Sequence, residues 1–142
     1  RMMLEVMNAL GWTYMRRAKL AEAEFVLTNA YEKLPQLESV DNLKLQVMGN
    51  LAIVRFRMGK LEESTMLDEQ SLKLSTSLFG PEHIETLSAK TRLGLAYWQQ
   101  GRNDEAESLL QEVSATSTQL PEVTSVLEAL SAIKGDAKDS GP

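Results

Sequence analysis

The sequence contains no cysteine and only one histidine among its 142 residues. Without cysteine, the chain forms no disulfide, no thiolate nucleophile and no zinc finger. One histidine supplies no multi-histidine metal site and little general acid–base chemistry of the usual kind. Glycine-rich phosphate loops of the GxGxxG or GxxxxGKS type and a nucleophile elbow are also missing. We therefore expect neither an enzyme nor a bound metal or cofactor.

Long hydrophobic runs are missing as well. No segment approaches the roughly 18 apolar residues of a membrane span, and residues 1–15 do not read as a signal peptide. These absences predict a cytoplasmic protein without a membrane partner. Because the chain begins at Arg1 rather than at methionine, we expect it to be a piece of a longer protein.

Positive charge is scarce, and it is unevenly distributed. The formal net charge is −5, which disfavours non-specific nucleic-acid binding. Residues 1–60 carry nine basic and six acidic side chains, whereas residues 61–142 carry six basic and fourteen acidic ones. The amino-terminal part is therefore better suited to an acidic partner.

A repeat of about 42 residues organises the chain. Residues 50–64 align with residues 92–106 at an offset of 42, and residues 10–23 align with 51–64 at an offset of 41. Each unit contains two runs of helical periodicity around a small residue, which predicts a helical hairpin. The turns of the three hairpins are placed at Ala18, Gly59 and Gly101.

No segment alternates with the period of a strand, so the fold class is all-α. Helices are predicted at about 4–17, 20–34, 41–58, 61–78, 82–100 and 103–117. Pro81 is expected in the first turn of the fifth helix, where Glu82 and Glu85 suit the positive helix end. His83, just beside them, is interpreted as a turn residue.

The carboxy-terminal end is expected to hold one more helix. An apolar stripe after Pro121 predicts a capping helix at about 122–134, followed by a disordered polar tail at 135–142. We thus predict one domain over residues 1–134, with units at about 4–35, 41–80 and 82–118.

The first unit resembles the tetratricopeptide repeat (TPR) pattern through Leu10, Gly11, Tyr14, Ala23, Leu27, Ala30 and Pro35. The long period and the connector at residues 78–87 resemble the kinesin-light-chain class, as also found in fungal nucleotide-binding receptor-like proteins. The resemblance implies an α-solenoid of three TPR helix-turn-helix units plus the capping helix. Asp68 departs from it, standing where the other units have leucine, which predicts looser packing or a rotated second helix in unit two.

The resemblance further implies that the first helices of the units line a concave groove that binds a peptide segment or a partner helix. The groove positions are Asn8, Trp12, Met15 and Arg16 in the first unit, Gln46, Asn50, Ile53, Phe56 and Arg57 in the second, and Arg92, Leu95, Trp98 and Gln99 in the third. The alternative is ordinary core, which is usual for an apolar stripe. We favour core for Met15, Ile53 and Leu95, whereas both interpretations stay open for the three aromatic residues.

Some TPR domains bind a chain-terminal carboxylate through five positions, of which only Asn50 and Arg92 match here, so chaperone-tail binding is not expected. Kinesin-light-chain grooves take acidic peptides with an aromatic anchor, which fits this chain better, and Arg16, Arg57 and Arg92 are expected to steer such a ligand. The implied partner is therefore a protein or peptide, acidic and with an aromatic or aliphatic anchor. A second hypothesis is the structural end of a longer array, used for self-association or for packing on an effector domain.

Overall fold

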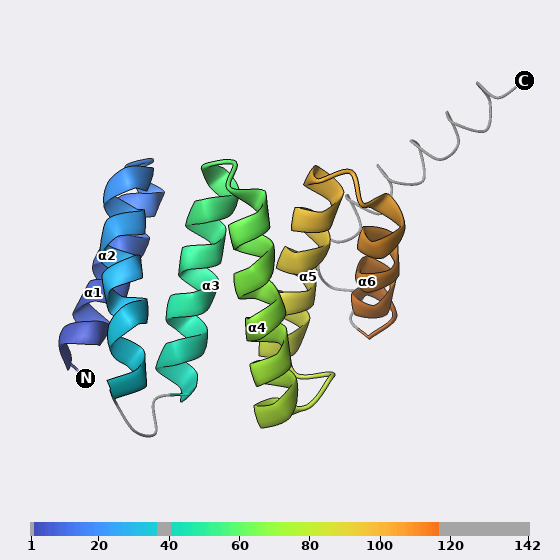
Figure 1. Cartoon of the computed structure of the whole chain (residues 1–142). Coiled ribbons are helices and arrows are strands. Elements are labelled where there is room, and N and C mark those ends of the chain that lie inside the picture. The colour runs from blue at the N-terminus through green and yellow to red at the C-terminus, as the bar shows by residue number, and fades with distance from the viewer. Residues whose placement is uncertain (1, 37–40, 117–142) are drawn as a thin grey trace, which may run out of the picture.

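The computed structural model describes residues 2–36 and 41–116, and this part of the chain folds into helices and turns (Figure 1). The α-helices are α1 (Met2–Arg16), α2 (Leu20–Lys33), α3 (Asp41–Arg57), α4 (Leu61–Phe79), α5 (Ile84–Gln99) and α6 (Asn103–Thr116). A 3-10 turn, η1 (Leu34–Gln36), extends α2. The predicted all-α solenoid is confirmed, while the predicted capping helix at 122–134 and tail at 135–142 lie outside the described residues.

The start of α5 differs from the prediction. Pro81 and Glu82 lie in a turn before the helix, and His83 is the N-cap, whose Nδ1 accepts a hydrogen bond from the backbone N–H of Glu85 at 3.2 Å. The reason is the end of α4 at Gly80, which takes a φ of +90° and a ψ of 168°. Pro81 and Glu82 form the turn that reverses the chain after Gly80, so α5 begins only after them.

The turns inside the three hairpins repeat one geometry. Gly59 and Gly101 have φ angles of 81° and 80°, and Ala18 takes the same left-handed conformation at 60°. The residue after each of them closes the turn by donating its backbone N–H to a carbonyl five residues back. These donors are Lys19 at 2.9 Å, Lys60 at 2.8 Å and Arg102 at 2.8 Å. Ala18 therefore adopts, at a steric cost, the conformation that glycine supplies freely in the other two units.

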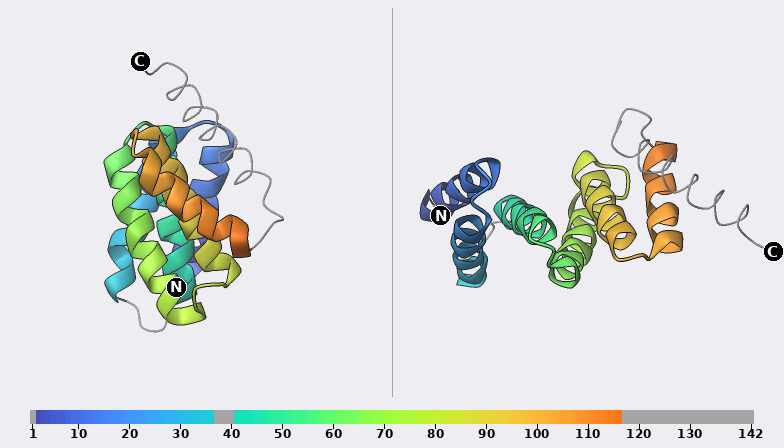
Figure 2. Two further views of the ribbon diagram at one scale, coloured as in Figure 1. Left: turned by 90° about the vertical axis from the view of Figure 1, so that its right-hand side faces the viewer. Right: turned by 90° about the horizontal axis from the view of Figure 1, so that it is seen from above.

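The helices stack into two layers. Each helix packs against the next one in the chain, and α3 also contacts α1 and α5. Seen from above, α2 and α4 lie along one side of the array and α1 and α5 along the other (Figure 2). We call α1, α3 and α5 the A layer and α2, α4 and α6 the B layer. Because the A helices approach one another more closely than the B helices do, the A layer forms the concave side.

Close packing inside the first and third hairpins depends on glycine. A Cβ atom at Gly11 would lie 2.5 Å from Cγ of Leu27, and one at Gly94 would lie 2.8 Å from Cγ of Leu110. In the second hairpin Ala52 replaces the glycine and Asp68 replaces the leucine. Asp68 is still buried, with 1% of its surface exposed, so α4 is not rotated outward at this position.

Charge is separated between the layers as well as between the halves of the chain. The A helices carry six basic and three acidic side chains. The B helices carry two basic and eleven acidic ones. The sequence assigns the basic part to the amino-terminal half, whereas the structure shows that much of this charge difference follows the two faces of the solenoid.

Candidate functional site

Side-chain amides from two A helices meet on the concave side. Asn50 donates a hydrogen bond from Nδ2 to Oδ1 of Asn8 at 2.8 Å, and Asn8 donates from Nδ2 to Oε1 of Gln46 at 3.4 Å. These three residues border a cavity of about 300 Å³, together with Ile53 and Arg92. We call it the amide cavity. The structure thus brings together three of the predicted groove residues, which come from two different units.

A second cavity of about 310 Å³ lies beside the first and shares Ile53 and Arg92 with it. We call it the Asp68 cavity. Its lining residues are Ala52, Ile53, Phe56, Arg57, Ser64, Asp68, Arg92 and Leu95. Asp68 is buried and Arg57 is exposed, so the carboxylate lies at the closed end and the guanidinium at the mouth. The cavity occupies the place that a leucine on the B helix fills in the other hairpins.

Arg92 connects the two cavities and is held in place from α4. Its Nε donates to Oδ1 of Asp68 at 3.0 Å, and its Nη2 donates to Oγ of Ser71 at 3.4 Å. A guanidinium has five N–H donors, so these two bonds leave donors for a ligand. Its side chain is 24% exposed, compared with 2% for Asp68.

Burial raises the pKa of Asp68 to about 6, against the lowering effect of the Arg92 charge and hydrogen bond. The cost of removing the carboxylate from water therefore exceeds the benefit of its ion pair. At pH 7 the group is still mostly ionised, and it keeps Arg92 between the cavities.

Five predicted groove residues lie elsewhere. Trp12, Arg16 and Gln99 are exposed and border neither cavity, and Trp98 is partly buried against the core of the third hairpin. Met15 is 1% exposed and belongs to the core between the first and second units. This burial agrees with the core interpretation favoured for Met15 over a place in the groove, because the neighbouring repeat covers the side chain. Ile53 and Leu95, for which core is favoured, border the Asp68 cavity, and Ile53 also packs against the core between the first and second units.

Sequence reasoning missed Ser64 and Asp68 as site residues. Both come from the B layer, whereas the groove was assigned to A helices only. Ser64 donates from Oγ to the carbonyl of Ala52 at 2.9 Å, which fixes one wall of the cavity. The signal for Asp68 is present in the sequence, because an acidic residue replaces a core leucine, but the prediction from it is looser packing or a rotated helix rather than a cavity.

The family model of the tetratricopeptide repeat matches residues 43–119, more than half of the chain. The chain belongs to the tetratricopeptide repeat family. The matched TPR region spans α3 to α6 and thus contains nearly all residues of both cavities. No curated protein matches the chain.

Solved TPR structures share the fold. A kinesin light chain protein of Podospora anserina, with nearly identical TPR-like repeats, superposes with a TM-score of 0.81 at 22% identity, over 96% of this chain and 69% of that one. The first TPR of Spaghetti (RPAP3), bound to the HSP90 peptide SRMEEVD, gives 0.72 at 19% identity, over 94% of both chains. The Sgt2 TPR domain of Aspergillus fumigatus gives 0.72 at 18%, over 98% and 84%.

Two further properties concern residues 2–36 and 41–116. No group of three or more His, Asp or Glu side chains in these ranges is arranged to hold a metal ion. None of the helices in the same ranges combines the length and the hydropathy that crossing a membrane requires.

Proposed function

We propose that the concave side binds a peptide segment or a partner helix of another protein, within a larger scaffold or receptor-like protein. The observation that carries this proposal is Arg92, which Asp68 holds at the boundary between the amide cavity and the Asp68 cavity. The TPR of Spaghetti (RPAP3), which has a similar fold, was solved with a peptide bound, and this supports the proposal.

The Asp68 cavity suits an apolar anchor. Its volume equals roughly ten molecules of liquid water, enough for one large side chain. Ile53, Phe56 and Leu95 supply apolar surface, and burying an aromatic or aliphatic side chain against them releases water. We infer that the anchor of the ligand is aromatic or aliphatic.

Two arginines can hold an acidic group of the ligand, while the lining also contains Asp68, which is paired with Arg92, and Glu85 at the border of the amide cavity. Arg57 stands at the mouth of the Asp68 cavity, and Arg92 faces both cavities. The remaining guanidinium donors match carboxylate oxygens. The amides of Asn8, Gln46 and Asn50 supply donors and acceptors for a peptide backbone. A ligand with an anchor and a neighbouring acidic residue therefore satisfies both cavities.

The test begins with a displayed library of random peptides, selected on the full chain, followed by calorimetry of the selected peptides. We expect enrichment of an aromatic or aliphatic residue near Asp or Glu. Phe56→Ala and Arg57→Glu should each weaken binding by about tenfold or more, since anchors and arginines dominate such interfaces.

Trp12→Ala is the matched control, because Trp12 is an exposed aromatic residue of the A layer that borders neither cavity. It should change affinity less than threefold. Equal affinity of the selected peptides for the wild type and for both cavity variants would refute the assignment. Circular dichroism confirms that each variant remains helical.

A second candidate function is structural, and the outer face of α1 favours it. Met2, Met3 and Val6 are exposed by 77%, 65% and 61%, an unusual amount for neighbouring apolar residues. This face suits a neighbouring repeat, an effector domain or a second copy of the chain. Sedimentation velocity at several concentrations tests the last case, and a concentration-independent monomer would exclude it.

A further inference from the structure

A wide cleft opens on the B-layer side of the second and third units. It has a volume of about 650 Å³ and lies between α4, α5 and α6. Apolar side chains make much of its surface, from Leu72 on α4, Leu93 and Tyr97 on α5, and Leu109 on α6. We call it the α4–α6 cleft. It shares no lining residue with the amide cavity or the Asp68 cavity.

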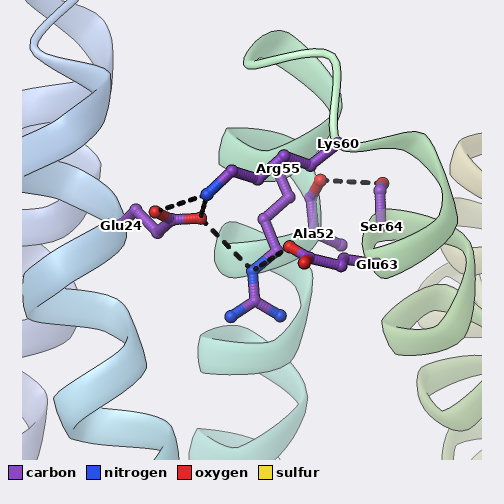
Figure 3. Close-up of polar contacts among 6 residues, drawn as sticks. All are labelled: Glu24, Ala52, Arg55, Lys60, Glu63 and Ser64. Atoms are coloured by element: carbon purple, nitrogen blue, oxygen red, sulfur yellow. Dashed lines mark hydrogen bonds and ion pairs between the residues drawn. The ribbon is translucent and has the colours of Figure 1, made fainter.

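The corresponding junction between the first and second units is bridged by ion pairs (Figure 3). Glu24 on α2 accepts hydrogen bonds from Nζ of Lys60 at 2.9 and 2.8 Å. Nε of Arg55 lies 3.6 Å from Glu24 and also 3.6 Å from Glu63 on α4. Charged side chains from both units therefore occupy this first junction.

Two sequence changes replace those bridges at the second junction. Thr65 stands in the position of Glu24, and it donates from Oγ1 to the carbonyl of Leu61 within its own helix. Tyr97 stands in the position of Arg55, and its hydroxyl donates to Oε1 of Glu69 at 2.9 Å. The second junction thus has a phenol ring where the first has a guanidinium, and this ring borders the cleft with 8% of the residue exposed.

The borders of the cleft are acidic. The flanking helices α4 and α6 together carry eight acidic side chains and one basic one. Glu69, Asp104 and Glu105 lie at the cleft itself, with Lys73 as the basic residue among its lining. Arg102 compensates one of these charges, because its Nε donates to Glu105 at 2.9 Å while its guanidinium lies 4.0 Å from the centroid of the Tyr97 ring.

We propose that the α4–α6 cleft is a second binding surface, which takes a segment of a partner protein that carries apolar side chains flanked by Lys or Arg. Burial of the apolar surface supplies the driving force for binding. The acidic side chains of the flanking helices favour a partner segment with positive charge. The carboxy-terminal segment of the chain itself has the wrong sign, since residues 117–142 contain four acidic and two basic residues. The partner is thus opposite in charge to the ligand of the concave side.

The probe is a synthetic amphipathic peptide of about 18 residues, with leucines on one helical face and lysines beside them. Two matched peptides replace its lysines by glutamates or its leucines by serines. Fluorescence anisotropy with the full chain is expected to show binding of the Leu/Lys peptide at least tenfold tighter than either control. Equal binding of the glutamate peptide, or no binding of any peptide at about 1 mM, overturns the proposal.

The location is tested with Ser108→Arg, which places a bulky cation in the cleft at an exposed position of α6. Met66→Arg is the matched control, since Met66 is the equivalent residue one repeat earlier, is 61% exposed and does not border the cleft. Ser108→Arg should weaken the Leu/Lys peptide at least tenfold, and Met66→Arg less than threefold.

Equal effects of the two variants overturn the location. If Phe56→Ala abolished binding of the Leu/Lys peptide, the peptide would bind on the concave side, and this result would also overturn the location. Sedimentation velocity adds a further outcome, because a dimer that Ser108→Arg dissociates would make a second copy the occupant and refute the basic partner.

Discussion

Replacing Asp68 by asparagine should stabilise the protein at neutral pH. The pKa of Asp68 rises from its ordinary 3.8 to about 6 in the folded chain, so folding favours the neutral form. Its contribution to the free energy of unfolding is therefore highest below about pH 4 and falls as the pH rises to about 6. At about 1.4 kcal/mol per pKa unit, the loss amounts to about 3 kcal/mol.

Asp68→Asn removes the ionisation and leaves a side chain of similar shape. Removing one partner of a buried ion pair often costs about 3–5 kcal/mol, because the other charge stays trapped. Arg92 is not trapped in this way, since it is 24% exposed and borders two open cavities. We therefore expect the variant to be more stable than the wild type by about 1–3 kcal/mol at pH 7.5.

The assay is urea unfolding followed by circular dichroism, for both proteins, between pH 4 and pH 8. The stability difference should shrink below about 1 kcal/mol at pH 4, where Asp68 of the folded wild type is neutral. Glu62→Gln, at an exposed position in the first turn of the same helix, is the control and should stay within about 1 kcal/mol at every pH. A variant less stable than the wild type at pH 7.5 would show that the ion pair outweighs the burial cost.

Two further substitutions test the backbone geometry of the hairpins by urea unfolding. Ala18→Gly removes the strain of a left-handed alanine, which costs about 1–2 kcal/mol, but it also raises the entropy of the unfolded chain, which costs about 0.4–1 kcal/mol of stability. The net effect should be a stabilisation of about 0.5–1 kcal/mol. Ala9→Gly inside α1 is the control and should destabilise by a similar amount. Gly94→Ala should cost about 1 kcal/mol or more, because its Cβ would lie 2.8 Å from the buried Leu110. Gly49→Ala is its control and should cost less, since its Cβ would lie 3.3 Å from a guanidinium nitrogen of the half-buried Arg92 and would meet no buried apolar side chain. Destabilisation by Ala18→Gly, or equal effects of the two glycine substitutions, would contradict the geometry.

The hairpins were predictable because local chemistry determines them. Small residues at Gly11 and Gly94, turn residues at equivalent positions and a helical apolar period all repeat along the chain. The start of α5 was not predictable from the proline alone, because the conformation of Gly80 decides how many residues the turn consumes. A Pro-Glu pair can start a helix only where the chain reversal that precedes the helix is already complete at the residue before the proline.

The site was only partly predictable for a different reason. Periodicity tells which residues share one face of a helix, but it does not tell what the next repeat places on that face. Met15 and Phe56 occupy the same repeat position, yet Met15 lies in the core between units and Phe56 borders a cavity. The difference depends on the neighbours, above all on the leucine-to-aspartate change at residue 68, which opens space beside Phe56.

The opposite charges of the two layers give the molecule an electric dipole that crosses the solenoid from one face to the other. Its field reaches about 8 Å into solution at physiological ionic strength. A charged ligand is therefore rotated and guided before it makes contact, so added salt should slow its association while changing its dissociation little. Two ligands of opposite charge would be guided to opposite faces, and the repeat array could hold both at once without competition.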